Sequence, residues 1–533
     1  MIWNISKKEF LSSLLTFKFL IGLLLCVLLI PISINLSLVH YLERLKIYQQ
    51  ESQKYEKEFK EIYVYSQIRP TVLKKPEPLS IFISDSEEVL GNKVKILLGQ
   101  VPFLAEGSAT ERENPFLASF LNIDFTFICS VLLSLFALLF TYDSFSKEKE
   151  SGTLATTLAN NISRDRLIVG KLLGHVLTLL PIILLSFIVS FLVILVHRSI
   201  EFKIEDWLRI LSISLSSLLY VLIFLLLGMF ISTLTSRSST SLMIALFIWV
   251  FLVIIVPNAS LFLSQSLTSI IPKEAIDKAT KNLNEEFGKK VKNFEEKLPK
   301  PVMGINWLYI GGIDGQTRMI SPKDVMENRR QLNSFSEPLR IEYAQRKYAI
   351  QQNYLNDLIR QSNLTKYLSI ISPLTIFRHI ASGLTRTDLE SHLQFIEKCK
   401  RYREQIINYY MSKNLFSSFA YFTQMKESEM RTADEWIAYY TEGKYKTYRE
   451  LESVTKGNFF RMFAEFKYGP IDILKHLKSY LDVNDILRFS LKNENYIDTL
   501  QRISIDLIVL IIIVVILFSL SYVATIRYDP RYQ

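Results

Sequence analysis

The segment Tyr142–Leu173, YDSFSKEKESGTLATTLANNISRDRLIVGKLL, is a polar and charged interval between two long apolar stretches. Lys147–Glu150 alternate basic and acidic side chains, and Ser151–Thr153 then supply residues that end one helix and cap the next. Leu154 and Leu158 follow with the i, i+4 spacing of one helical face. Composition alone is equally compatible with a solvated loop, but this order of residues favours a structured element.

The end of the same segment resembles a helix start. Ser163 lies just before Arg164 and Arg166, at the place where the chain becomes apolar again. A serine at this place can cap the first turn of a helix that re-enters the membrane. The interval is therefore predicted to connect two membrane spans on one side of the bilayer.

The bulk composition indicates a membrane protein with large soluble parts. The 533 residues are 49% hydrophobic and 21% charged, too apolar for an ordinary soluble protein and too charged for one buried wholly in lipid. The net charge of +10 is dispersed without a Lys/Arg run, so nucleic-acid binding is not expected. Cys26 and Cys129 lie in apolar runs and Cys399 stands alone, which indicates neither a disulfide framework nor a metal cluster.

The apolar runs predict six membrane spans. They cover residues 17–38, 121–142, 168–196, 208–234, 240–264 and 503–526. Each is long enough to cross ~30 Å of hydrocarbon at about 1.5 Å per residue. The first is read as a span rather than a cleaved signal peptide, because its apolar core is long and no A-x-A-like site follows it.

Charge placement predicts the orientation of these spans. An even number of spans puts both termini on one side, and cytosolic loops carry an excess of Lys and Arg. The basic residues on that side are Lys7, Lys8, Lys147, Lys149, Arg164, Arg166, Lys171, Arg237, Arg527 and Arg531. The opposite short loop, 197–207, mixes both signs. Both termini are therefore predicted to be cytosolic, in a plasma (inner) membrane, with an amphipathic helix over 1–16 on the membrane surface and a short tail over 527–533.

This topology leaves residues 39–120 and 265–502 outside the membrane. The first segment holds a helical seam formed by Leu45, Tyr48, Ser52, Tyr55, Phe59 and Ile62. Arg69–Ile83, rich in proline and β-branched residues, predicts strand and turns. The predicted fold is a mainly α-helical polytopic membrane protein, with six transmembrane helices and a mostly helical extracytoplasmic domain that contains a small β element.

The second outer segment is predicted to be mostly helical. Helical patterns cover 329–362, 388–412, 433–441, 447–466 and 471–490. We expect the apolar face of the first of these helices, which carries Tyr343 and Leu358, to pack against the helix over 40–62. Residues 368–384 are apolar but too short to span, and a buried core helix and an interfacial helix are equally compatible with them.

Motifs for catalysis are absent from the sequence. There is no G-x-x-x-x-G-K-[ST] phosphate loop, and Gly170-Lys171 lacks the upstream glycine and the following hydroxyl of that motif. The six histidines have no metal-ligand spacing, and Cys399 has no evident base partner. No catalytic residue and no metal site are predicted.

Three carboxylates, Asp124, Asp143 and Asp506, lie near the ends of the predicted spans. An ionisable group in a span is a functional candidate because it is costly there. All three are close enough to the membrane edge to reach headgroups or water, so an interfacial role is the simpler interpretation. No charged relay lies at the middle of the membrane, which disfavours an ion-coupled carrier.

Several stretches resemble one known family. They are Asp124–Leu154, Ser163–Gly174, Leu227–Leu242 and Ile248–Asn258, with Pro76–Phe82, Asn114–Phe120 and Ile371–Phe377 in the outer segments. The most specific is YDSFSKEKESGTL within the first. Together they resemble the membrane subunits of type-2 ABC transporters, in the branch that includes nitrous-oxide-reductase maturation permeases.

The resemblance implies a function for the opening segment. In such transporters the loop after the second span holds a coupling helix that fits a groove of a cytosolic ATPase. The matching positions are Glu148, Glu150, Gly152, Thr153 and Leu154, and Leu158 and Arg164 complete the candidate ATPase-coupling site. ATP and Mg would be bound by the partner subunit and no cofactor by this chain. Closure of the ATPase would push the helix as a rigid body, with the 1–16 helix beside it.

The leading hypothesis is a permease that pairs with a separate ABC ATPase, and that exports a substrate or transmits force across the membrane. A second permease subunit, identical or related, is expected, because six helices alone make a poor conduit. Besides membrane lipid, an extracytoplasmic protein partner is possible, but the sequence identifies no substrate. The alternative is a membrane anchor or signal transducer that does not transport and whose outer domain binds a partner.

Overall fold

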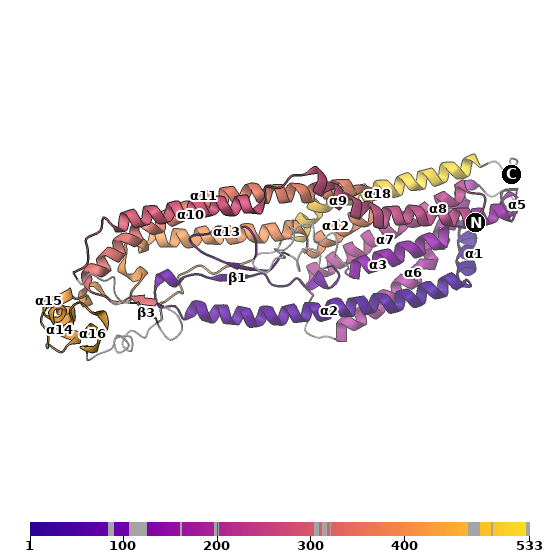
Figure 1. Cartoon of the computed structure of the whole chain (residues 1–533). Helices are drawn as coiled ribbons and strands as arrows, with labels where there is room; N and C mark the ends of the chain where they lie inside the picture. The colour runs from indigo at the N-terminus through magenta and orange to yellow at the C-terminus, as the bar shows by residue number, and fades with distance from the viewer. Residues whose placement is uncertain are drawn as a thin grey trace.

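The molecule is elongated, with apolar helices at one end and a polar helical domain at the other (Figure 1). This computed structural model describes residues 1–83, 90–105, 125–159, 163–196, 200, 202–302, 309–311, 317–319, 321–466, 480–491 and 494–528. Both chain ends lie at the apolar end of the molecule, which is called the terminal face below (Figure 1). The part that extends beyond the membrane helices, away from this face, is called the distal domain.

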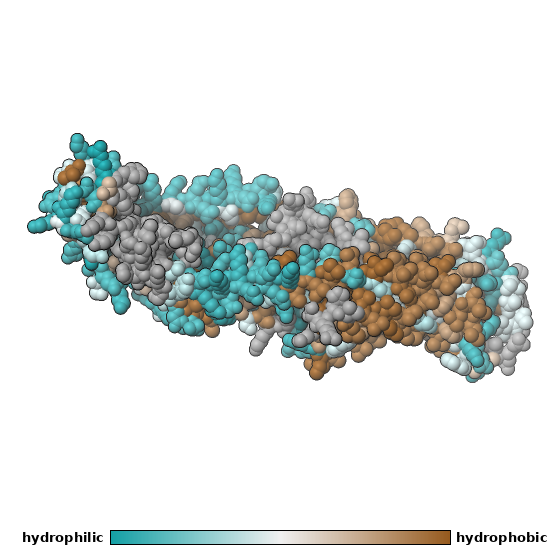
Figure 2. All heavy atoms as spheres, turned by 90° about the horizontal axis from the view of Figure 1, so that it is seen from below, coloured by the Kyte–Doolittle hydropathy of each residue, from teal (hydrophilic) through white to brown (hydrophobic). Residues whose placement is uncertain are grey.

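Among the residues that the structure describes, six helical segments are long and apolar enough to cross a membrane. They are α2 (Phe17–Lys60), α3 (Phe125–Thr141), α6 (Arg164–Val196), α7 (Ile204–Leu234), the run of α8 (Ser238–Val250), a π-helical turn (Phe251–Ile255) and α9 (Val256–Leu267), and α18 (Tyr496–Arg527). Hydrophobic residues gather over this end of the molecule and hydrophilic ones over the rest (Figure 2). The predicted fold class, a mainly helical polytopic membrane protein, is confirmed.

The first helix, α1 (Ile2–Leu14), crosses the terminal face and packs against α6 (Figure 1). Gly170 and Gly174 of α6 make this close approach possible. A Cβ atom added at Gly170 would lie 2.8 Å from Ile5 Cβ, and one at Gly174 would lie 2.6 Å from Glu9 Cβ. Ser6 Oγ donates a hydrogen bond of 2.9 Å to the Gly170 carbonyl. Small residues spaced G-x-x-x-G are a common means of bringing two helices together in membranes.

The distal domain is built from long helices and two small hairpins. Its long helices are α10 (Lys273–Glu295), α11 (Lys323–Leu368) and α13 (Leu389–Ser412). Its shorter helices are η1 (Tyr65–Gln67), η2 (Pro78–Ile81), η5 (Ser369–Ile371), α12 (Pro373–Thr385), η6 (Leu415–Ser417), η7 (Phe419–Tyr421), η8 (Glu427–Glu429), α14 (Ala433–Tyr440), α15 (Tyr448–Thr455) and α16 (Phe459–Ala464). Strand β1 (Thr71–Leu73) pairs antiparallel with β2 (Lys93–Lys95), and β3 (Tyr309–Gly311) with β4 (Thr317–Met319).

The helix α2 does not end at the membrane. It continues without a break past Leu38, where the predicted span ends, to Lys60 in the distal domain. At about 1.5 Å per residue, its 44 residues measure about 66 Å. The predicted span and the predicted seam of 40–62 are therefore one helix, which forms a continuous rod between the terminal face and the distal domain.

The expected packing of α2 along α11 is corrected by the structure. Tyr343 of α11 packs against Phe287 of α10, and Leu358 clusters with Leu90 and Leu355. Phe59 of α2 and Met326 of α11 lie in one hydrophobic cluster. The face of α11 that carries Tyr343 packs against α10, and Tyr48, Ser52 and Tyr55 of α2 line a cavity beside β1.

Within residues 368–384, Ile370 and Ile371 of η5 are 39% and 64% exposed, whereas the chain from Pro373 onward forms a buried core helix, α12. All of its residues except His379 are buried. It packs against α18, α7 and α3, and Phe377 stacks on Tyr220 of α7 with ring centroids 5.2 Å apart. Arg209 of α7 donates to the Leu384 carbonyl at 3.0 Å. The apolar face of α12 is thus covered by protein.

The predicted helix over 471–490 is wrong for the part that the structure describes, residues 480–490, which are turn and extended chain. Asp482 Oδ1 accepts a hydrogen bond of 3.0 Å from the Asn484 backbone N–H, a local turn that competes with helix. The Leu481 N–H donates at 2.8 Å to the Ile62 carbonyl. Residues 471–479 lie outside the described part of the chain.

Candidate coupling site

Two short helices follow the second span at the terminal face. They are α4 (Ser146–Glu150) and α5 (Thr153–Ala159), and α5 projects from the end of the molecule beside both termini (Figure 1). Gly152, which joins them, has a φ of +71°. This left-handed conformation costs other L-residues about 1–2 kcal/mol, which explains a glycine between the two helices.

The helix α4 is attached to the ends of two spans. The ammonium of Lys149, which is buried, donates to the Thr233 carbonyl, and to the Thr235 carbonyl at 3.2 Å, at the C-terminus of α7. Glu150 Oε2 accepts hydrogen bonds from the N–H and Oγ of Ser238, at 3.1 and 3.0 Å, at the N-terminus of α8. A cation at a helix C-terminus and an anion at a helix N-terminus both complement the helix dipole.

The start of α4 is bound to α7 through one hydroxyl. Ser232 Oγ accepts hydrogen bonds of 2.9 Å from the backbone N–H groups of both Phe145 and Ser146. These donors have no partner inside their own short helix, so the α7 hydroxyl satisfies groups that would otherwise be buried and unpaired. The helix pair is therefore fixed to α7 at both ends of α4.

A buried lysine joins α4 to α1 and α6. Lys171 Nζ lies 2.8 Å from Glu9 Oε1 of α1 and 2.9 Å from Glu148 Oε1 of α4, and it donates to the Ser144 carbonyl at 2.9 Å. The side chain of Lys171 is 1% exposed, and those of Glu9 and Glu148 are 13% and 18% exposed. These three side chains are called the Lys171 triad below.

The triad keeps Glu9 ionised. Burial alone would raise the pKa of the Glu9 carboxyl, but the adjacent Lys171 ammonium lowers that pKa below its ordinary value. Two carboxylates therefore share one desolvated cation, so none of the three charges is left alone in the interface. A displacement of α4 would act on α1 and α6 through these bonds.

Sequence reasoning missed the central members of this site. In the sequence, Lys171 contributes to the positive charge on one side and follows Gly170 in a stretch that is not a phosphate loop, and no motif marks Glu9. The available signals were an ionisable residue inside the apolar run 168–196 and the G-x-x-x-G spacing of Gly170 and Gly174 around it. Their pairing depends on α1 folding back onto α6, which no local pattern shows.

One of the two leucines predicted to share a face of the coupling helix is turned inward. Leu154 is 2% exposed and packs with Phe145, Leu167 and Met229 inside the bundle. The exposed residues of α4, α5 and the turn between them are charged, polar or small: Lys147, Glu150, Ser151, Gly152, Thr153 and Thr156. Leu158 belongs to α5, but its side chain lies outside the described part. A partner that docks here meets charged groups, hydroxyls and backbone rather than Leu154.

The remaining predicted residues hold neighbouring elements. Arg164 Nη1 donates to the Ile526 and Thr525 carbonyls at the C-terminal end of α18. Asp143 pairs with Lys18 of α2 at 2.8 Å. Glu148 and Glu150 each bind a different helix, as described above. The structure thus brings Glu148, Glu150 and Asp143 to one loop that contacts α1, α2, α6, α7 and α8.

The two carboxylates at the far ends of the spans behave differently. Asp506 is 6% exposed, pairs with Lys366 of α11 at 2.9 Å and lines a cavity of about 630 Å³, so its carboxylate is held by the protein. Asp124 lies outside the described residues. Among the residues that the structure describes, no group of three His, Cys, Asp or Glu side chains is placed to hold a metal. Burial in α13 raises the pKa of the Cys399 thiol to about 12.

The structure is a bundle of membrane helices in which a pair of short helices, attached to several spans, follows the second span. The chain matches the ABC-2 family transporter protein over residues 3–424, and it belongs to this family. It is therefore a permease component of an ABC system, and membership implies partnership with an ABC ATPase and a second permease. No curated protein is similar enough to match it. The narrower resemblance to nitrous-oxide-reductase maturation permeases stays a prediction.

Proposed function

We propose that this permease couples ATP hydrolysis by a separate, cytosolic ABC ATPase to export or force transmission across the plasma membrane. The observation that carries the proposal is the Lys171 triad. A cation buried at the base of a span is shared by the short helix α4 and the surface helix α1. Such an arrangement converts a push on one loop into movement of several spans.

The exposed face of α4 and α5 is the surface on which the ATPase docks. This face presents Ser151, Gly152, Thr153 and Thr156, while Leu154 anchors the helix pair to the bundle. Attachment to α1, α6, α7 and α8 makes the pair move with those helices rather than fold away from them. Closure of the ATPase would then rotate or tilt packed helices as a rigid body.

The length of α2 favours force transmission over simple conduction. Lys18 in its first turn pairs with Asp143 just before α4, at 2.8 Å. The same helix ends at Lys60, beyond the membrane, where Phe59 lies in the hydrophobic cluster of the distal domain. A push at Asp143 would therefore reach the distal domain along one unbroken helix.

The orientation and the assembly are parts of the same proposal. The basic residues of the terminal face support a cytosolic location of both termini. Met243 and Phe247 of α8 are 71% and 70% exposed, which suits contact with lipid or with a second permease subunit. We propose that the functional unit holds two such permeases, identical or related, with ATP and Mg bound by the ATPase subunits alone.

Affinity purification tests the docking surface. Tagged wild-type chain is extracted from membranes, and ABC ATPase subunits that copurify are identified by mass spectrometry and assayed for ATP hydrolysis. Thr153→Arg and Thr156→Arg enlarge the exposed face without touching the anchor Leu154, so we expect both to abolish copurification. The matched control is Ser453→Arg on the exposed face of α15, at the other end of the molecule.

Two results would overturn the proposal. In the first, no ABC ATPase copurifies with the wild type, which would favour an anchor or signal transducer. In the second, both arginine variants retain the ATPase and its stimulation, which would place docking elsewhere. Folding is checked by size-exclusion chromatography of each variant in detergent.

A further inference from the structure

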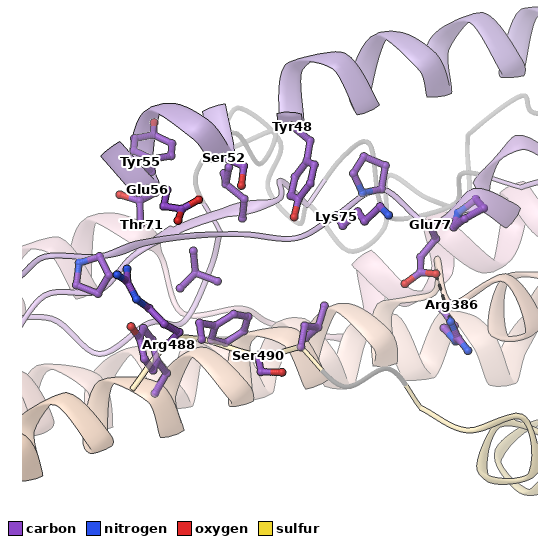
Figure 3. A pocket seen from close by; sticks show the side chains of 18 of the residues that line it. Tyr48, Ser52, Tyr55, Glu56, Thr71, Lys75, Glu77, Arg386, Arg488 and Ser490 are labelled. Atoms are coloured by element: carbon purple, nitrogen blue, oxygen red, sulfur yellow. Dashed lines mark hydrogen bonds and ion pairs between the residues drawn. The ribbon is translucent and has the colours of Figure 1, made fainter. Parts of the chain in front are cut away.

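A cavity of about 860 Å³ lies in the distal domain beside the outer half of α2. Tyr48, Ser52 and Tyr55 of α2 point toward strand β1, and residues 488–491 line the opposite side (Figure 3). This volume falls within the ~300–1,000 Å³ typical of ligand pockets. The aromatic seam of α2 thus faces an open groove rather than another helix.

One edge of strand β1 is unpaired along this groove. The Lys74 N–H donates to the Asn92 carbonyl and the Ile96 N–H donates to the Pro70 carbonyl, at 2.7 and 2.9 Å. Backbone groups alternate sides along an antiparallel strand, so Pro70, Val72 and Lys74 face β2, and Thr71 and Leu73 face away from it. Within the part of the chain that the structure describes, no hydrogen bond engages the backbone of Thr71 or Leu73.

The residues around this edge mark it as a bounded site. Thr71, Leu73 and Lys75 all line the cavity. Pro70 and Pro76 flank the edge, and proline cannot extend a ladder of hydrogen bonds. An open edge normally invites aggregation and is covered or kept short. Here it is short and recessed, so it can accept one strand without templating a long sheet.

Lys75, Lys203, Arg386 and Arg488 line the groove together with Glu56, Glu77, Glu205 and Asp206, so its affinity for an acidic ligand depends on which of these charges are already paired. Its carboxylates already have partners: Arg386 pairs with Glu77 at 3.4 Å and with Glu205 at 3.3 Å, and Glu56 pairs with Lys60 at 2.7 Å. Asp206 accepts a hydrogen bond of 2.9 Å from the Lys203 backbone N–H.

The cations of the groove are less engaged. Lys75, Lys203 and Arg488 line it and have no ion pair among the described residues. The guanidinium of Arg488 lies 4.3 Å from the centre of the Phe59 ring, and it also interacts electrostatically with Glu56. The groove therefore offers cationic and aromatic side chains around a row of free backbone groups.

We propose that this groove binds an extended, acidic polypeptide segment as an added strand on β1. Its backbone would pair with Thr71 and Leu73, its apolar side chains would contact Tyr48, Tyr55 and Phe59, and its carboxylates would meet the cations. Strand addition supplies affinity through the main chain and selectivity through alternate side chains. The inference goes beyond the coupling role and does not depend on it.

Binding is measured by fluorescence polarisation, with the full chain in phosphatidylcholine nanodiscs. The probe is a short fluorescein-labelled peptide that alternates valine with glutamate. Leu73→Pro removes a backbone N–H that faces the groove and leaves the bonds between β1 and β2 intact, so we expect at least about tenfold weaker binding. Leu73→Ala keeps the N–H and is expected to bind within about twofold of the wild type.

The hairpin offers a matched control. Lys95 pairs opposite Thr71, so its N–H points away from β1 on the other side of the hairpin. Lys95→Pro makes the same chemical change outside the groove, and we expect unchanged binding. A probe N-methylated on alternate backbone amides is expected to lose binding, and a probe with lysine in place of glutamate is expected to bind at least about tenfold more weakly.

Several outcomes would overturn the proposal. They are no saturable binding to the wild type, equal loss in Leu73→Pro and Lys95→Pro, or equal binding of the lysine probe. Competition by anionic phosphatidylglycerol nanodiscs, with no effect of Leu73→Pro, would assign the cations to lipid headgroups instead. Because none of these measurements involves an ATPase, failure here is distinct from failure of the proposed coupling function.

Discussion

Replacing Lys171 by methionine tests whether the Lys171 triad holds the coupling helices to the bundle. The change keeps the length and the apolar stem of the side chain but removes the charge. It leaves the carboxylates of Glu9 and Glu148 facing each other without their cation. Breaking a buried pair by removing one partner costs about 3–5 kcal/mol, and we expect the lower end because both carboxylates keep some contact with water.

Hydrogen exchange in nanodiscs, read by mass spectrometry, measures this effect locally. A loss of about 3 kcal/mol corresponds to about a hundredfold lower protection of amides in α1 and α4, whereas α13 in the distal domain should be unchanged. Lys147→Met is the matched control, because Lys147 lies in α4, one of the helices whose protection is measured, and its side chain is exposed. It should change protection by less than about 0.5 kcal/mol.

Neutralising the carboxylates distinguishes charge from packing. The triple variant Glu9→Gln, Glu148→Gln, Lys171→Met contains no uncompensated charge and should recover much of the lost protection. If it is no more protected than Lys171→Met alone, the loss arises from packing and the electrostatic reasoning is refuted. Wild-type protection in Lys171→Met would refute it as well.

Three further substitutions test other parts of the structure. Burial raises the pKa of the Glu337 carboxyl above its ordinary value of 4.5, so the contribution of Glu337 to the free energy of unfolding is favourable at low pH and is lost as the pH rises through the folded pKa. Glu337→Gln should therefore raise the unfolding temperature at pH 8. Circular dichroism melts should show this gain shrinking toward pH 4. In Gly152→Ala the added Cβ meets no atom within 4 Å, but alanine is strained at a φ of +71°, so the protection of the α4 amides against exchange should fall by about 1 kcal/mol. An unchanged exchange rate would contradict the strain. Arg209→Met leaves the Leu384 and Glu494 carbonyls without their buried donor, so the amides of α12 should lose about 3 kcal/mol of protection, whereas the exposed Lys203→Met should have no effect.

The positions of the membrane helices follow from local sequence. A run of apolar residues must bury its backbone in its own hydrogen bonds, and helix is the structure that does so within one segment. Local sequence also determines the break between α4 and α5 at Gly152, because only a residue without a Cβ adopts that φ freely. Hydropathy did not locate the end of α2, since a polar, well-formed helix can continue a span into water without any change in its backbone.

Side-chain partners depend on helices that are distant in sequence. Leu154 and Leu158 share a helical face, but the spacing does not say whether that face meets a partner protein or the chain's own bundle. The fold decides this for Leu154 by placing α7 beneath α4. The helix predicted over 471–490 is wrong for residues 480–490 for a related reason. A local turn at Asp482 and a backbone hydrogen bond from Leu481 to Ile62 outweigh the helix propensity of these residues.

The Tyr142–Leu173 segment by itself determined that a charged helix pair with a break at Gly152 joins two spans, because charge, periodicity and the position of a glycine are properties of neighbouring residues. The N-terminal groups of α4 are capped by Ser232 of α7, which is a tertiary contact. Only the tertiary structure decided what that pair holds. Glu9 and Lys171 are far apart in the chain, and they meet because Gly170 and Gly174 let α1 lie against α6. The unpaired edge of β1 is likewise defined by what does not cover it, and only the arrangement of all the surrounding elements can show that.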